Sequence, residues 1–246
     1  MRRKRRKAFS IIGWLAVFWL SFSLLAVQTE AASFPNVERL EQHAAQLERA
    51  MKANQWSKPY RLFNQVKRDY EAAKKEVARV RPQTARAQLE KRIAAGEQTM
   101  KKASAYISAV ESGERLRALT ANVDRALRTG DVDVVYDSYG PLEYQIRKTA
   151  ILIGRVPGAS LREKMEGWFQ RPALAVKLRA YDPINIMKAM DKLLDAYDEG
   201  DIARAERLLS LCDRWLPNVV DAATRKQLAV YIDDFKAPVV LDVDIE

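Results

Sequence analysis

The chain has 246 residues, and its 42 Lys and Arg against 32 Asp and Glu give a formal net charge of +10. It contains one histidine, His43, and one cysteine, Cys212, so neither a histidine-based metal cluster, a His-dependent triad nor an internal disulfide can form within it. The sequence also lacks a glycine-rich phosphate loop, a nucleophile elbow and zinc spacing. We therefore expect no catalytic residues, no metal and no cofactor, and we predict that the protein is not an enzyme.

The first segment of the chain has the composition of a secretory signal peptide. Six basic residues at positions 2–7 precede an apolar run over residues 8–27, and small residues surround Ala31. We expect cleavage after Ala31, so that residues 1–31 form a signal peptide and the protein is secreted to the cell wall or cell surface. The apolar run is also long enough to span a bilayer, which leaves open an uncleaved anchor with the body outside the cytoplasm.

After residue 31 few residues break helices, and apolar residues recur at the three- and four-residue spacing of helices. Asn36 can cap the first helix, whose expected apolar side is Val37, Leu40, Ala44, Leu47 and Met51. The second helix is expected to be buried through Leu62, Phe63, Val66, Tyr70, Ala73 and Val77. The Gly130-Asp131 and Gly200-Asp201 pairs each combine a glycine that ends one helix with an aspartate that caps the next. The expected helical stretches, in chain order, are residues 36–54, 57–80, 82–128, 131–153, 160–199, 201–216 and 219–235.

The 82–128 stretch is longer than an ordinary globular helix. Only Gly96 and Gly113 interrupt it, as weak stops, so we expect one long helix or two collinear ones. The single cysteine, Cys212, is expected to be a buried structural thiol because leucines and a tryptophan surround it in sequence. His43 is expected on a helix face.

The two Gly-Asp pairs lie seventy residues apart and each follows a similar helix, which indicates an internal repeat. The repeat predicts an all-α fold, an elongated rod of consecutive three-helix bundles that share long connecting helices. The expected parts are a basic first bundle at residues 32–105, a second bundle at 106–175, a third at 176–237 and an extended tail at 238–246.

Positive charge is concentrated in the first half of the expected mature chain. Residues 32–129 contain 20 Lys and Arg against 11 Asp and Glu, whereas residues 130–246 contain 16 against 20. Outside the cytoplasm this asymmetry does not indicate nucleic acid, which we do not expect as a partner. It suggests that the first half meets an anionic surface such as a wall polymer or lipid headgroups.

The expected second helix carries a basic stripe. At 100° per residue, Arg61, Arg68, Lys75 and Arg79 fall within about 40° of one another and face away from the apolar side. Guanidinium groups form paired hydrogen bonds with carboxylate or phosphate, and tyrosine rings stack on sugars, so this face suits an anionic polysaccharide. A helix face that is merely solvated has the same pattern of charges. The candidate polymer-binding residues here and on the next helix are Tyr60, Arg61, Lys67, Arg68, Lys74, Lys75, Arg79, Arg86, Lys91, Arg92, Lys101 and Lys102.

Scattered helical positions resemble a known family. The stretch Leu142 to Arg147, with Thr149, Ile151-Leu152 and Arg155-Val156 after it, is similar to the N-terminal domain of SbsC-type surface-layer (S-layer) proteins. Further similar positions are Tyr60, Asn64, Tyr70, Ala73 to Lys75, Ala105 to Ile107 and Ala109 upstream, and Met187 to Ala189, Gly200-Asp201, Ala205, Leu216-Pro217 and Asp221-Ala222 downstream. The resemblance covers nearly the whole chain and includes no catalytic signature.

The resemblance implies an elongated domain of consecutive three-helix bundles that binds the anionic secondary cell wall polymer of a Gram-positive wall through basic and tyrosine side chains. S-layer proteins of this type continue into β-sandwich domains that build a lattice, whereas the last residue of this sequence is Glu246. The expectation is therefore restricted to wall attachment. Two alternatives remain open: a membrane-anchored helical scaffold or sensor domain that binds a protein partner, and a binder of anionic lipid surfaces.

Overall fold

A computed structural model of the chain describes residues 33–53 and 56–236. The chain divides into two compact units, Met1–Pro35 and Asn36–Glu246, and the packing below is that of the second unit. The described residues form helices and turns without any strand, which confirms the predicted all-α class. The predicted signal peptide at 1–31 and extended tail at 238–246 lie outside the described residues.

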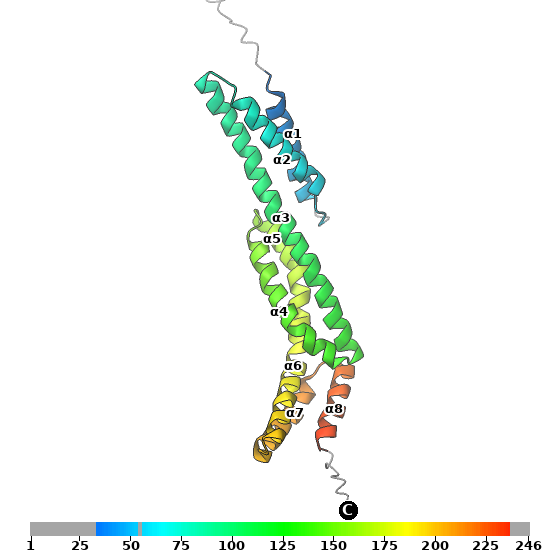
Figure 1. The fold of residues 1–246 in the computed structure, drawn as a ribbon. Coiled ribbons are helices and arrows are strands. Elements are labelled where there is room, and N and C mark those ends of the chain that lie inside the picture. The colour runs from blue at the N-terminus through cyan, green and yellow to red at the C-terminus, as the bar shows by residue number, and fades with distance from the viewer. Residues whose placement is uncertain (1–32, 54–55, 237–246) are drawn as a thin grey trace, which may run out of the picture. The chain divides into compact units, whose positions relative to one another are not determined.

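The helices follow one another with short connections, as Figure 1 traces from blue to red. In chain order they are α1 (Pro35–Lys52), α2 (Tyr60–Val77), α3 (Gln83–Thr129), α4 (Val132–Gly154), α5 (Ala159–Met165), α6 (Arg171–Asp198), α7 (Ile202–Trp215) and α8 (Ala222–Lys236). A π-helical turn, Glu166–Gln170, joins α5 to α6, and a 3₁₀ turn, Leu216–Asn218, follows α7.

Several predicted bounds shift for local reasons. The second helix begins at Tyr60 rather than at 57, because Pro59 occupies the N-cap position. The stretch predicted at 160–199 contains the π-helical turn and is therefore not one regular α-helix. The last helix begins at Ala222 rather than at 219, since the 3₁₀ turn is followed by extended backbone at Val219.

The stretch predicted at 82–128 is one continuous helix. At about 1.5 Å per residue, the 47 residues of α3 extend over about 70 Å. This helix packs against α2, α4, α6 and α8. The predicted bundle boundaries at 105/106 and 175/176 fall inside α3 and α6, and the grouping into three bundles stays a prediction.

The two predicted glycine-aspartate junctions have the expected geometry. Gly130 and Gly200 adopt positive φ angles of 80° and 72° after the ends of α3 and α6. The carboxylates of Asp131 and Asp201 then accept hydrogen bonds from the backbone N–H groups of Val134 and Arg204, at 3.2 and 2.9 Å. Each aspartate caps the next helix, as predicted.

Helix α1 packs through the apolar side that the sequence predicts. All five of its predicted core residues are buried: Val37, Leu40, Ala44, Leu47 and Met51. The imidazole Nδ1 of His43, on the neighbouring face, lies 2.6 Å from the Asp69 carboxylate of α2. The contact between His43 and Asp69 thus joins α1 to α2, which is a structural role.

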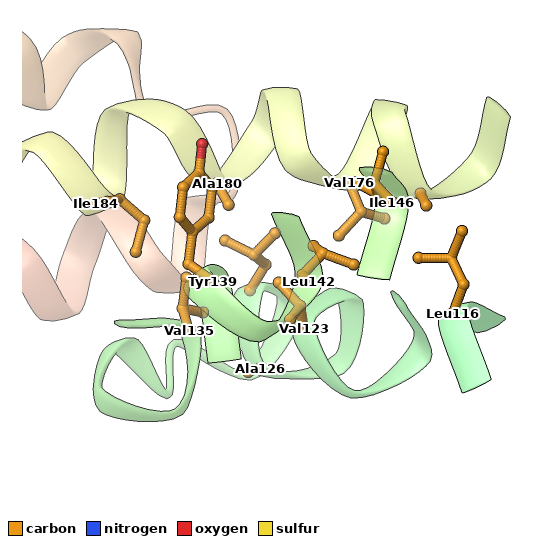
Figure 2. Close-up of a cluster of buried hydrophobic side chains, with 12 residues drawn as sticks. Leu116, Val123, Ala126, Val135, Tyr139, Leu142, Ile146, Val176, Ala180 and Ile184 are labelled. Carbon is orange, nitrogen blue, oxygen red and sulfur yellow. The ribbon is translucent and has the colours of Figure 1, made fainter. Parts of the chain in front are cut away.

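A central core cluster lies between α3, α4 and α6 (Figure 2). Its residues include Leu116, Val123, Ala126, Val135, Tyr139, Leu142, Ile146, Val176, Ala180 and Ile184. A further cluster packs α6 against α7 and α8 and includes Cys212, which is buried as predicted. Burial raises the pKa of the Cys212 thiol to about 11.

Candidate functional site

Helix α2 has one buried side and one basic side. Val66, Ala73 and Val77 are buried, which orients the helix. The basic stripe of Arg61, Arg68, Lys75 and Arg79 is exposed on the other side. Within the described ranges, none of these four cations forms an ion pair. Their charges are therefore available to an external anion.

A groove of about 800 Å³ runs between α2 and α3, beside the basic stripe. We call it the α2–α3 groove. Its lining comprises Phe63, Lys67, Arg68, Tyr70, Glu71, Ala72 and Lys75 of α2 with Glu97, Met100, Lys101 and Ser104 of α3. Predicted polymer-binding residues from both helices, Lys67, Arg68, Lys75 and Lys101, are thus brought together at one hollow.

Aromatic side chains hold two of the lysines of α2. The Lys67 ammonium lies 5.9 Å from the centroid of the Phe63 ring, and the Lys74 ammonium lies 5.4 Å from that of Tyr70. Such cation–π contacts contribute about 0.5–1 kcal/mol at exposed sites and leave the positive charge in place. Both lysines can therefore still attract an anion.

The predicted residues of α3 differ, because most of them have carboxylate partners. Both ends of the Arg92 guanidinium donate to Glu41 of α1 at 2.7 Å, and this contact raises the pKa of Arg92 and lowers that of Glu41. The Lys102 ammonium lies 3.5 Å from the Glu48 carboxylate, also on α1. These two cations connect α1 to α3.

Arg86 and Lys101 pair within α3 itself, with Glu90 at 3.0 Å and Glu97 at 2.8 Å. The hydrogen bond from Lys101 lowers the pKa of Glu97 and raises that of Lys101. Exposed pairs of this kind contribute little to stability because water screens them, so a ligand can separate them.

Tyr60 has an exposed side chain whose hydroxyl group already has a partner. Its hydroxyl donates to the Glu111 carboxylate of α3, and the adjacent Lys58 pairs with Glu114. These contacts attach the start of α2 to α3. Lys91, in contrast, is exposed and forms no ion pair with the described residues.

Sequence reasoning missed the apolar part of the groove. Phe63 is predicted as a core residue, yet it is only half-buried and lines the hollow together with Met100. The four-residue spacing from Phe63 to Lys67 places an aromatic ring beside a cation on one helix face. This spacing is the sequence signal that could have predicted the apolar part of the groove. Nothing local to Met100 marks it, because its role depends on how α3 lies beside α2.

Two other kinds of feature are absent from the described ranges. These ranges contain no group of three or more His, Cys, Asp and Glu side chains that could hold a metal ion. No helix among them is long and apolar enough to cross a membrane.

Known proteins resemble the chain in sequence. A family model described as the SbsC C-terminal domain matches residues 44–174. An S-layer protein of Geobacillus stearothermophilus is 27% identical over 120 residues, which are 48% of this chain and 10% of that protein. The matched region of the family model includes every predicted polymer-binding residue.

Solved structures resemble the chain in fold. The crystal structure of the N-terminal part of the bacterial S-layer protein SbsC superposes with a TM-score of 0.66 at 19% identity, over 82% of this chain and 54% of that one. The structure of domains 1–6 of the surface layer protein SbsC superposes with a TM-score of 0.65 at 19% identity, over 83% of this chain and 32% of that chain. The chain thus spans 10% to 54% of the length of these relatives.

These matches confirm the resemblance to SbsC-type proteins that the helical positions predict. Because the family model covers more than half of the residues, the chain belongs to the SbsC C-terminal domain family.

Proposed function

We propose that this protein is a non-catalytic attachment module of the cell surface that binds an anionic secondary polymer of the cell wall. Its relatives are S-layer proteins, which supports a surface role. The observation that carries the proposal is the exposed basic stripe of α2, whose cations have no carboxylate partners among the described residues. A cationic face of this kind attracts a polyanion at long range and pairs with it at contact.

The proposed site is centred on α2 rather than spread evenly over both helices. Arg61, Lys67, Arg68, Lys74, Lys75 and Arg79 supply its charges, and Lys91 adds an exposed cation on α3. Arg92 and Lys102 contribute less, because a ligand would first have to separate them from Glu41 and Glu48. The Tyr60 hydroxyl also contributes less, since it is bound to Glu111, whereas the exposed Tyr60 ring remains accessible to a sugar.

The test is retention of the protein by purified cell walls from the producing cells at increasing salt. Native walls should retain it, walls stripped of secondary polymer by acid extraction should not, and retention should fall as salt rises because screening shortens the reach of each charge. Equal retention by stripped walls would exclude the secondary polymer as the ligand.

A double substitution, Arg68→Glu with Lys75→Glu, locates the site. Retention should weaken at least tenfold, because the two reversed charges each remove an attraction of about 0.5–1 kcal/mol and each add a repulsion. The matched control is Arg207→Glu with Arg214→Glu, which has the same seven-residue spacing on exposed positions of α7 and the same change in charge. If the two variants lose binding equally, net charge rather than the α2 stripe accounts for retention.

A further inference from the structure

The α2–α3 groove combines features that simple attraction of a polyanion does not need. Three of its half-buried lining residues, Phe63, Ala72 and Met100, are apolar, whereas Lys67, Arg68 and Lys75 around them are exposed and cationic. Clefts with apolar walls and a few convergent polar groups are typical of sites that enclose a small molecule or one unit of a polymer. The lining therefore indicates a ligand with an apolar face in addition to negative charge.

Two carboxylates in the groove narrow the class of ligand. Glu71 is exposed and forms no ion pair with the described residues, and Glu97 accepts hydrogen bonds from Lys101 and from the Tyr70 hydroxyl at 3.3 Å. An acidic peptide or a bare polyphosphate would be repelled by both carboxylates and offers few donors to them. Sugar hydroxyl groups, in contrast, donate to ionised carboxylates in strong hydrogen bonds.

An anionic saccharide ring matches each part of this lining. Its C–H face suits Phe63 and Met100, its carboxylate or phosphate suits the cations, and its hydroxyl groups suit Glu71 and Glu97. Arg68 and Lys75 are two helical turns apart, about 10 Å along α2, so cations are present over a length greater than one ring. This spacing suits a segment of polysaccharide that lies along the groove.

We propose that the α2–α3 groove binds a sugar ring of the wall polymer, with the apolar face of the ring against Phe63 and Met100 and its anionic group between Arg68 and Lys75. This inference rests on the proposed function and adds a part of the binding that does not depend on long-range charge. Because contact with apolar side chains is not screened, that part should persist at high salt.

The experiment fills the groove and leaves its charges in place. Ser104 of α3 is exposed and lines the groove, so Ser104→Trp introduces an indole there. The matched control is Gln98→Trp, at a residue of α3 that is also exposed and does not line the groove. Circular dichroism and thermal unfolding should show that both variants keep the helical fold of the unmodified protein.

Binding is then measured with polymer released from the walls by acid extraction, in about 0.1 M and about 1 M salt, where the Debye length falls from about 10 Å to about 3 Å. At 1 M salt, Ser104→Trp should bind at least tenfold more weakly than Gln98→Trp, which should match the unmodified protein. Poly-glutamate is the acidic-peptide probe, and its low-salt binding should be the same in both variants.

The outcomes separate the two proposals. If the unmodified protein does not bind the polymer at either salt concentration, the proposed function fails and the groove inference fails with it. If the unmodified protein binds and Ser104→Trp binds equally well, only the groove inference is overturned. A loss of poly-glutamate binding equal to the loss of polymer binding would also overturn it, because the groove would then be selecting charge and not a sugar ring.

Discussion

Two glycines of α3 matter for packing and not for chain flexibility. The sequence suggests Gly96 and Gly113 as weak stops within a long helix, yet α3 continues through both. A Cβ atom on Gly96 would lie 2.9 Å from the Leu40 side chain, and one on Gly113 would lie 2.5 Å from the Phe169 ring. Each glycine permits a close approach between α3 and a neighbouring element.

We predict that Gly113→Ala lowers the free energy of unfolding by about 1–3 kcal/mol, because the ring of buried Phe169 must move to admit the methyl group. Urea denaturation followed by circular dichroism measures this change. Gly154→Ala, in the last turn of α4 with no neighbour within 4 Å of its Cβ position, should be neutral or slightly stabilising. Equal effects of the two substitutions would contradict the close approach at Gly113.

Cys212 should make stability fall with rising pH. Its folded-state pKa of about 11 lies above the ordinary value near 8.5, so between these values the unfolded chain releases a proton that the folded chain retains. The thiol therefore stabilises the fold fully below about pH 8.5 and loses that contribution as the pH approaches 11. We predict that Cys212→Ala costs less stability at pH 10.5 than at pH 7.5, as measured by urea denaturation. A constant difference would argue against a buried neutral thiol.

At the scale of the helices, a side chain from α2 caps the start of α1. Asn36 is predicted as the N-cap, but the helix begins at Pro35, and Asn36 and Val37 donate their backbone N–H groups to the Glu76 carboxylate at 3.1 and 3.2 Å. The Asn36 side-chain amide donates to the same carboxylate at 3.1 Å. The negative charge of this carboxylate is also attracted to the positive end of the α1 helix dipole.

We predict that Glu76→Ala destabilises the protein by about 1–2 kcal/mol, because it leaves the first N–H groups of α1 without their acceptor. Thermal unfolding detects the loss as a lower Tm. Glu71→Ala removes the same charge from an exposed position on the same helix and should change Tm much less. If both substitutions lower Tm equally, the capping contact is not responsible.

At the scale of the molecule, α3 connects distant parts of the packing. Leu89 and Ile93 are buried near its start, and Leu116, Val123 and Leu127 belong to the core that it forms with α4 and α6. Because one helix takes part in both regions, its continuity couples their stabilities.

We predict that Arg115→Pro, at an exposed position inside α3, lowers the unfolding free energy by about 3 kcal/mol or more, because proline removes a backbone hydrogen bond and clashes with the preceding turn. Gln83→Pro, at the first position of α3, should be tolerated, since Pro82 before it is already extended with a ψ of 118°. Circular dichroism and urea denaturation compare the two. A small effect of Arg115→Pro would show that the helix need not be continuous.

Prediction from sequence succeeds where the signal is local. The apolar side of α1, the caps at Asp131 and Asp201 and the basic side of α2 all follow from spacing along one helix. Prediction is less accurate at Phe63, which is assigned to the core although it lines the groove. One helix alone cannot distinguish a side chain covered by a neighbour from one left half-open beside it.

The sequence by itself determined the helices, their glycine-aspartate boundaries and the excess of positive charge in the first half, because each depends on neighbouring residues or on composition. Only the tertiary structure decided which of those charges remain available. Arg92 is paired with a carboxylate 51 residues away in the chain, and the Tyr60 hydroxyl with one equally distant, whereas Arg68 and Lys75 have no such partner among the described residues. Contacts between residues so far apart arise only when the helices pack.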